Sequence, residues 1–186
     1  MPSWARVATR SRVPLGFLFA AAYLWWAKPT WPFLSAGIVI VAAGVTIRAL
    51  ASGHIRKNAE LATTGPYAYT RNPLYLGSIV IALGFIVAAR NWWIGLAVLV
   101  MFAFIYLPVI KAEEAYLRSA FPDYSHYAGV VPRLLPRLTP YRSGAAIETS
   151  SQQFSSALYW RHREYNAALG SALMIGALVL KILVLH

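Results

Sequence analysis

Long apolar stretches separated by polar connections dominate this sequence. Five such stretches occupy positions 13–27, 31–50, 73–89, 91–110 and 167–185. A helix needs about 20 mostly apolar residues to cross a bilayer. The pattern therefore predicts an all-α integral membrane protein with about five transmembrane helices. The first stretch is short, which predicts a tilted helix with Trp25 and Trp26 at the membrane surface.

The third and fourth stretches are separated by little more than Arg90 and Asn91. A link this short predicts a tight antiparallel helical hairpin. Asn72 followed by Pro73 predicts the start of its first helix, because Asn can cap backbone N–H groups and Pro suits the first helical position. The second helix is predicted to continue out of the membrane until the breaker at Phe121–Pro122.

The chain divides by pattern into three parts. Residues 1–50 are predicted to be an amino-terminal scaffold of two spans, and residues 51–140 a core with the polar loop and the hairpin. Residues 141–186 are predicted to hold a Ser-rich linker and an additional span. The last helix is predicted to start near Ser151 and to run without a break into the final apolar stretch.

Composition supports a membrane protein and orients it. Of the 186 residues, 59% are hydrophobic and 12% are charged, and the formal net charge is +11. Fourteen of the 17 Lys and Arg residues lie in the amino-terminal tail and in the connections 48–71 and 111–163. The positive-inside rule then predicts a cytoplasmic amino terminus and a cytoplasmic face for both polar regions, as in a prokaryotic inner membrane. Because the basic residues are spread between spans, no nucleic-acid partner is expected.

Several kinds of chemistry are disfavoured by residue type. The chain has no cysteine, which excludes disulfides and thiolate catalysis. His54, His126 and His162 are scattered without the spacing of metal ligands, so no metal is expected. We find no phosphate-binding glycine loop, nucleophile elbow or dinucleotide fingerprint.

The predicted hairpin brings the start of its first helix close to the end of its second. Arg71, Asn72 and Tyr75 are therefore expected near Glu113 and Glu114. A carboxylate at a membrane exit is expected to be paired or functional, because burying it in the bilayer is costly. An alternative is that Glu114 only forms a surface helix pair with Arg118, four residues later.

Two further groups have alternative explanations. Tyr124 and Tyr127 are three residues apart and could share a helix face, either to anchor a helix at the membrane surface or to form the wall of a pocket. Arg133 lies between apolar residues and prolines, where it could serve a site or reach a lipid phosphate.

These residues fall within an ordered set of motifs. The segment 65–77 reads Gly-Pro-Tyr-Ala-Tyr-Thr-Arg-Asn-Pro-Leu-Tyr-Leu-Gly, and it is followed by Glu113–Glu114, Phe121, Tyr124, Tyr127 and the Val-Pro-Arg-Leu-Leu-Pro segment at 131–136. Together they resemble the bipartite signature of the integral-membrane isoprenylcysteine carboxyl methyltransferase and phospholipid methyltransferase superfamily. The resemblance covers about 48–136. Asn72 replaces a His that is common in the family, and Pro122 replaces a common Gly.

The resemblance implies that S-adenosylmethionine binds in a cytoplasm-facing pocket made by the hairpin and the carboxyl-terminal segment, and that a lipophilic acceptor or lipid enters from the bilayer. It implies catalytic roles for Glu113, Glu114 and Arg133, and acceptor contacts for His54 and Arg133. The residues it implies for cofactor binding are Tyr67, Arg71, Asn72, Pro73, Tyr75, Leu76, Glu113, Tyr124, Tyr127 and Pro132. The methyl acceptor and the oligomeric state stay open.

Two other functions are compatible with the same pattern. Membrane sterol and steroid reductases resemble this superfamily in the carboxyl-terminal region, which leaves an NADPH-dependent reductase as an alternative. The Arg-Asn-Pro-x-Tyr motif at 71–75 and the short chain favour the methyltransferase. A structural or regulatory membrane protein that kept the fold is the third interpretation.

Overall fold

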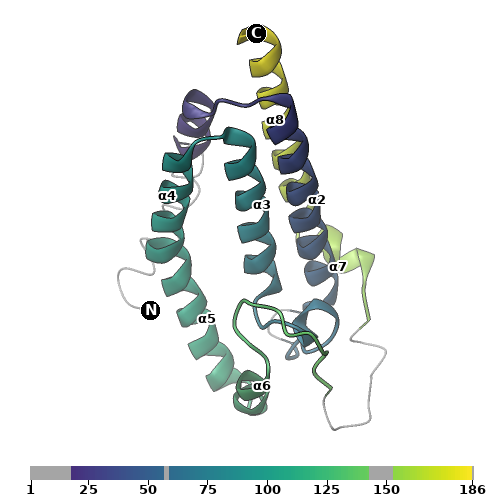
Figure 1. Cartoon of the computed structure of the whole chain (residues 1–186). Helices are drawn as coiled ribbons and strands as arrows, with labels where there is room; N and C mark the ends of the chain where they lie inside the picture. The colour runs from purple at the N-terminus through teal and green to yellow at the C-terminus, as the bar shows by residue number, and fades with distance from the viewer. Residues whose placement is uncertain (1–17, 57–58, 143–152, 186) are drawn as a thin grey trace. The chain divides into compact units, whose positions relative to one another are not determined.

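The computed structural model of the chain describes residues 18–56, 59–142 and 153–185, and within these ranges it contains helices and no strand (Figure 1). A helix over 18–26 comes first. The elements that follow are α2 (Trp31–His54), the 3₁₀ helix η1 (Gly65–Ala68), α3 (Pro73–Ala89), α4 (Trp92–Met101), the π-helical η2 (Phe102–Tyr106), α5 (Leu107–Ala120), α6 (Tyr124–Val130), α7 (Ser156–Arg161) and α8 (Tyr165–Leu185). The predicted all-α class is confirmed.

Three helical stretches are long and apolar enough to cross a membrane. They are Trp31–His54, Trp92–Ala120 and Tyr165–Val184, and the apolar α3 is shorter at 17 residues. Large apolar side chains on them are exposed, as at Val39 and Leu173, which suits contact with lipid. The chain is thus an integral membrane protein. The count of five spans stays a prediction, because the first predicted span begins outside the described residues.

The structure forms two compact units, and several helices contribute to both. The described parts of the first unit are 18–41, 82–116 and 171–185. Its core gathers buried side chains from the helix over 18–26, α2, α3, α4 and α8: Tyr23, Ala27, Leu34, Ala88, Ala89, Ile94, Leu178 and Ile182. The second unit comprises 42–81 and 117–170 in its described parts.

The hairpin between α3 and α4 is formed as predicted. The helix α3 ends at Ala89, and Asn91 caps α4 by accepting a hydrogen bond from the Trp93 N–H over 3.1 Å. The Asn91 amide also donates to the Trp26 carbonyl over 3.1 Å. The short link is therefore fixed in place by a side chain that serves both the cap and the preceding helix.

Lys181 is a charged residue inside the apolar helix α8. Its ammonium donates to the carbonyls of Leu24 and Trp25, with a distance of 3.1 Å to the latter. These carbonyls belong to the last turn of the helix over 18–26, where a cation is favoured by the helix dipole and by unpaired acceptors. This contact attaches the additional carboxyl-terminal span to the first described helix.

The second helix of the hairpin runs without a break from Trp92 to Ala120, but it is not α-helical throughout. Residues Phe102–Tyr106 form a π-helical turn between α4 and α5. Pro108 accounts for it, because proline has no N–H to bond the carbonyl of Phe104 four residues earlier and its ring is not compatible with a regular α-helical turn. The predicted end at Phe121–Pro122 is confirmed, since α5 stops at Ala120.

In the second unit, the predicted unbroken last helix is wrong. The chain forms α7, a turn over 162–164, and then α8, with Arg163 at a φ of +55°. The left-handed backbone at Arg163 ends one helix and starts the next. The predicted start at Ser151 and most of the predicted linker lie outside the described residues.

Candidate functional site

The site is built on a sharp turn before α3. Gly65 has a φ of +56°, a conformation that glycine adopts without strain, and the short helix η1 follows it. The imidazole of His54 fills the space beside Gly65, since a Cβ there would lie 2.5 Å from the His54 Nε2 atom. His54 thus contacts the first residue of the 65–77 motif from the end of α2.

The two halves of the sequence signature are hydrogen-bonded to each other. The Arg71 N–H donates to the Pro132 carbonyl over 2.9 Å. The Arg137 N–H donates to the Tyr69 carbonyl over 3.0 Å, and the Tyr141 N–H donates to the Ala68 carbonyl over 2.8 Å. Segments separated by 61 to 73 positions along the chain therefore form one backbone-linked frame within the second unit.

Side chains complete this frame at the carbonyl of Arg133. The Thr70 hydroxyl donates to it over 3.1 Å, and the Asn72 amide donates to it over the same distance. Both donors are buried, with Thr70 2% and Asn72 8% exposed. Asn72 therefore provides a hydrogen bond here that does not require a titratable imidazole. The backbone carbonyl of Asn72 also accepts a hydrogen bond from the Leu76 N–H over 3.0 Å, as expected of the residue that caps α3.

Aromatic side chains form the wall behind the frame. Tyr124 and Tyr127 are buried together with Val131, and Tyr141 packs edge-on against Tyr127. The Tyr127 hydroxyl donates to the Tyr67 carbonyl over 2.7 Å. Burial, with a smaller contribution from Tyr124, raises the pKa of Tyr127 well above its usual value of 10.0. Tyr127 is therefore a neutral hydrogen-bond donor that positions the first motif.

Most predicted site residues lie in the second unit, and the predicted acids do not. The second unit holds His54, Tyr67, Arg71, Asn72, Pro73, Tyr75, Leu76, Tyr124, Tyr127, Pro132 and Arg133, whereas Glu113 and Glu114 belong to the first unit. The structure joins Tyr67 to Tyr127, Arg71 to Pro132 and Asn72 to Arg133. The proximity of the two glutamates to Arg71 stays a prediction.

Glu114 is 5% exposed on α5, while Glu113 is half-buried. The Glu114 side chain is therefore not solvated, and its alternative pairing with Arg118 stays a prediction. Arg118 is itself exposed, and its guanidinium lies over the Tyr124 ring, 5.7 Å from the centroid. This burial keeps Glu114 among the candidates for a functional acid.

Two contributions were not predicted. Thr70 was not singled out, although its hydroxyl also approaches the Leu134 carbonyl at 3.2 Å. Arg48 was counted only for topology, yet it donates to Glu164, to the Leu74 carbonyl and to the Ser78 hydroxyl. Thr70 stands directly before the Arg-Asn-Pro motif, which is a usable signal. No signal in the sequence pairs Arg48 with Glu164, which lies 116 positions later.

Comparison with known proteins places these motifs in a family. The phospholipid methyltransferase family profile matches residues 34–124, which include the 65–77 motif, both glutamates and Tyr124. A protein-S-isoprenylcysteine O-methyltransferase from Schizosaccharomyces pombe is 32% identical over 123 residues, 66% of this chain and 48% of the relative. The chain belongs to the isoprenylcysteine carboxyl methyltransferase and phospholipid methyltransferase superfamily. The Val-Pro-Arg segment follows the range of the family profile.

Two further relatives of the chain are named for metal resistance. The cobalt-zinc-cadmium resistance protein CzcN of Cupriavidus metallidurans is 38% identical over 87 residues, 47% of this chain and 40% of that protein. The nickel-cobalt-cadmium resistance protein NccN of Alcaligenes xylosoxydans xylosoxydans is 36% identical over 88 residues, 47% of this chain and 41% of that protein. Each match spans less than half of the relative's own length. No solved structure matches the chain significantly.

Proposed function

We propose that this protein is an S-adenosylmethionine-dependent methyltransferase that acts on a lipophilic acceptor presented by the membrane. The observation that carries the proposal is the frame in which the Thr70 hydroxyl and the Asn72 amide hold the Arg133 carbonyl. This frame joins the two parts of the superfamily signature that the proposed pocket requires. The isoprenylcysteine relative supports an acceptor that carries a hydrophobic group.

The donor set of the second unit suits the cofactor's polar end. Arg71 supplies a guanidinium beside the start of α3, where the first N–H groups of a helix have no acceptor within it. A guanidinium and a helix amino terminus both favour a carboxylate, which S-adenosylmethionine carries. Tyr67, Tyr75 and Tyr124 supply aromatic faces, which favour a sulfonium cation. Glu113 and Glu114 are the proposed counter-charges for that cation.

The bound cofactor would supply a methyl group already activated on its sulfonium sulfur. The chain's own residues then have to bind, orient and keep water out. Alignment of two reactants can lower a barrier by roughly 7–11 kcal/mol. The buried Tyr124, Tyr127 and Val131 provide a dry wall next to the frame. Arg133 and His54 are the proposed contacts for the acceptor, and Arg133, Glu113 and Glu114 are the proposed catalytic residues.

The proposed orientation puts the amino terminus and the site in the cytoplasm. The distribution of Lys and Arg among the connections supports it, because positive charge stays on the cytoplasmic side. A prokaryotic inner membrane is the proposed location. In this arrangement residues 1–50 are the scaffold, 51–140 the methyltransferase core and 141–186 an addition.

A ligand-dependent melting experiment tests this function. The full chain is purified in detergent and heated with S-adenosylmethionine, S-adenosylhomocysteine or NADPH. A ligand at 100 times its dissociation constant adds about 2.7 kcal/mol of stability. We expect both adenosyl compounds to raise the melting temperature and NADPH to leave it unchanged. A shift with NADPH alone would support the reductase, and no shift with any of the three would support a non-enzymatic role.

A further inference from the structure

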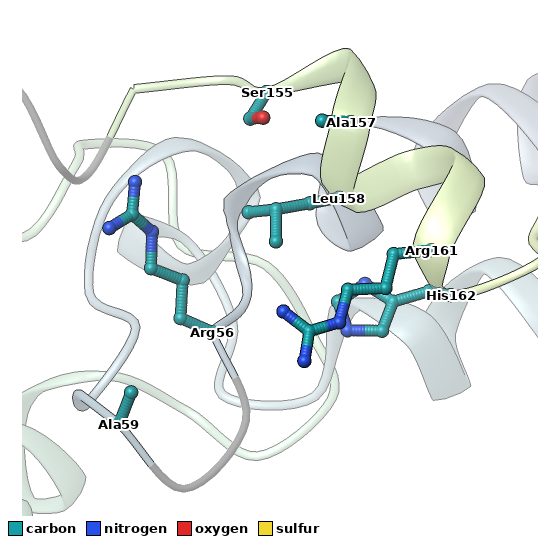
Figure 2. A pocket seen from close by; sticks show the side chains of 7 residues that line it. All are labelled: Arg56, Ala59, Ser155, Ala157, Leu158, Arg161 and His162. Atoms are coloured by element: carbon teal, nitrogen blue, oxygen red, sulfur yellow. The ribbon is translucent and has the colours of Figure 1, made fainter.

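A cavity in the second unit is lined by residues outside the proposed methyltransferase site. It has a volume of about 440 Å³ and lies between the connection after α2 and the carboxyl-terminal segment around α7 (Figure 2). The described residues that line it are Arg56, Ala59, Ser155, Ala157, Leu158, Arg161 and His162. None of them belongs to the signature motifs, and five come from the part of the chain that follows the family match.

The lining of this cavity is strongly basic. Arg56 and Arg161 contribute two permanent positive charges, and no acid is among the described lining residues. The Arg161 side chain extends from α7 toward the stretch that carries Arg56, and His162 lies beside it (Figure 2). Arg56 forms an ion pair with Glu60 at 3.4 Å, where both side chains are partly exposed. One partly exposed carboxylate leaves the cavity with a net positive charge.

The wall around α7 is held by contacts to the last turn of α2. The Ser155 N–H donates to the Gly53 carbonyl over 2.9 Å. The His162 Nδ1 atom lies 3.1 Å from the Ser52 carbonyl oxygen, and because a carbonyl only accepts, Nδ1 carries the hydrogen. Glu164, two residues after His162, accepts a hydrogen bond from the Arg48 guanidinium. Arg161 is therefore presented by a segment that is hydrogen-bonded to α2 on both sides of it.

The cavity lies at the ends of two apolar helices. The membrane-length helix α2 ends at His54, two residues before Arg56, and α8 begins at Tyr165, four residues after Arg161. Two large aromatic residues stand next to lining residues in the sequence, and their exposed fractions are high: 49% for Phe154 and 62% for Trp160. Exposed aromatic residues next to span ends are typical of the headgroup region of a bilayer. Lipid phosphates occupy this depth.

We propose that Arg56 and Arg161 bind a phosphate group in this cavity. Two guanidinium groups can each donate paired hydrogen bonds to phosphate oxygens, which makes arginine the preferred partner for such an anion. The phosphate could be the monoester headgroup of an anionic lipid or a soluble phosphate. The position at two span ends favours the lipid. The carboxyl-terminal addition to the superfamily core thereby acquires a binding role of its own.

Thermal shift of the full chain in detergent tests the proposal and separates the sources. The probes are dioctanoyl phosphatidic acid, dioctanoyl phosphatidylcholine with the same acyl chains, and inorganic phosphate. We expect phosphatidic acid to stabilise at a concentration about tenfold lower than phosphatidylcholine, since only the former carries a net dianionic phosphate. A lipid site responds to phosphatidic acid at lower concentration than to inorganic phosphate, and a site for soluble phosphate responds equally to both. Either result supports the proposal.

The variants Arg56→Gln and Arg161→Gln are expected to weaken the phosphatidic acid response about tenfold each. Arg163→Gln is the matched control, because it removes the same charge two residues from Arg161 but does not line the cavity. Arg161 has an exposed side chain, so its replacement is expected to fold normally. An equal response to phosphatidic acid and phosphatidylcholine without any effect of inorganic phosphate, or a response that both variants keep, would overturn the proposal. The variants should keep their S-adenosylmethionine shift, which makes this test independent of the proposed function.

Discussion

Arg48 and Glu164 form a bidentate ion pair that joins α2 to the start of α8. The Arg48 Nε atom lies 3.0 Å from one Glu164 carboxylate oxygen, and Nη2 lies 2.8 and 3.0 Å from the two oxygens. Nη1 of the same guanidinium donates to the Leu74 carbonyl over 3.2 Å and to the Ser78 hydroxyl over 2.6 Å on α3. One arginine thus connects the superfamily core to the additional span.

Breaking this pair should destabilise the protein. The Arg48 and Glu164 side chains are 23% and 12% exposed, which is between a surface pair and a buried pair. We expect Glu164→Gln to lower the free energy of unfolding by about 2 kcal/mol, between the values typical of the two classes. A double-mutant cycle with Arg48→Met, measured by thermal unfolding in detergent, isolates the coupling. Strictly additive losses would show that the two residues act independently.

The hydroxyl of Tyr127 should contribute to the free energy of unfolding through its hydrogen bond. Tyr127→Phe removes the hydrogen bond to the buried Tyr67 carbonyl and leaves that carbonyl without its donor. We expect a loss of about 1–3 kcal/mol in unfolding free energy, measured by thermal melts. The control is Tyr69→Phe, two residues after Tyr67, where the side chain is 38% exposed. Equal effects of both changes would contradict the positioning role of Tyr127.

The same tyrosine predicts a pH dependence in alkali. Burial raises the pKa of Tyr127 above 10.0, so above pH 10 the unfolded chain loses this proton while the folded chain keeps it. Stability should therefore fall as pH rises through 10, by up to about 1.4 kcal/mol per pH unit from this group. Melting curves of the wild type should show a steeper alkaline decline than those of Tyr127→Phe. Parallel declines would mean that Tyr127 ionises alike in both states.

The close contact of α2 with α3 at Gly44 leaves no room for a larger side chain there. A Cβ added at Gly44 would lie 2.7 Å from the Gly77 carbonyl oxygen, which belongs to the helix backbone and cannot rotate away. We expect Gly44→Ala to destabilise by about 1–3 kcal/mol, as overpacking does. Gly176→Ala in α8 is the control, because nothing lies within 4 Å of its added Cβ. A neutral Gly44→Ala would show that the helices separate without cost.

Removing charge from the proposed cofactor site should affect binding more than expression. We expect Arg71→Ala, Arg133→Ala and Glu113→Gln each to weaken the response to S-adenosylmethionine about tenfold, the loss typical of one charged hydrogen bond. Thermal shift and methyl transfer from labelled S-adenosylmethionine measure the effect. Arg142→Gln, an exposed arginine outside the motifs, is the control. Wild-type binding and turnover in all three variants would mean that these side chains only anchor the protein in the membrane.

The sequence predicted the elements whose limits are set by local chemistry. The bounds of α3 agree with the prediction, because Asn72–Pro73 starts the helix and Arg90–Asn91 ends it. The end of α5 before Pro122 follows from the same kind of signal. The π-helical turn was missed because the prediction passed over Pro108, although a proline inside a helical pattern is a usable signal. The break at 162–164 was missed because it depends on a left-handed Arg163 and on a distant partner of Glu164.

The candidate site was predictable at the level of its motifs and not of its contacts. Motif order named Arg71, Asn72, Tyr127 and Arg133, which the structure brings together in the second unit. The hydrogen bonds that join them use mostly backbone carbonyls, which every residue has and which no sequence pattern distinguishes. Thr70 was overlooked for that reason, since its role depends on the carbonyls of Arg133 and Leu134. Long-range backbone pairing has to be seen in three dimensions.

The frame between the two motifs has a consequence for how such proteins can diverge. Its bonds from Arg71 to Pro132, from Arg137 to Tyr69 and from Tyr141 to Ala68 are made by main-chain atoms alone. A change of side chain at these positions leaves the donor and the acceptor in place, provided that proline does not replace a donor. Selection can therefore change the side chains of this region one at a time while the backbone hydrogen bonds of the frame are kept. Under the proposed function, new methyl acceptors would become accessible through point mutation, without a new fold.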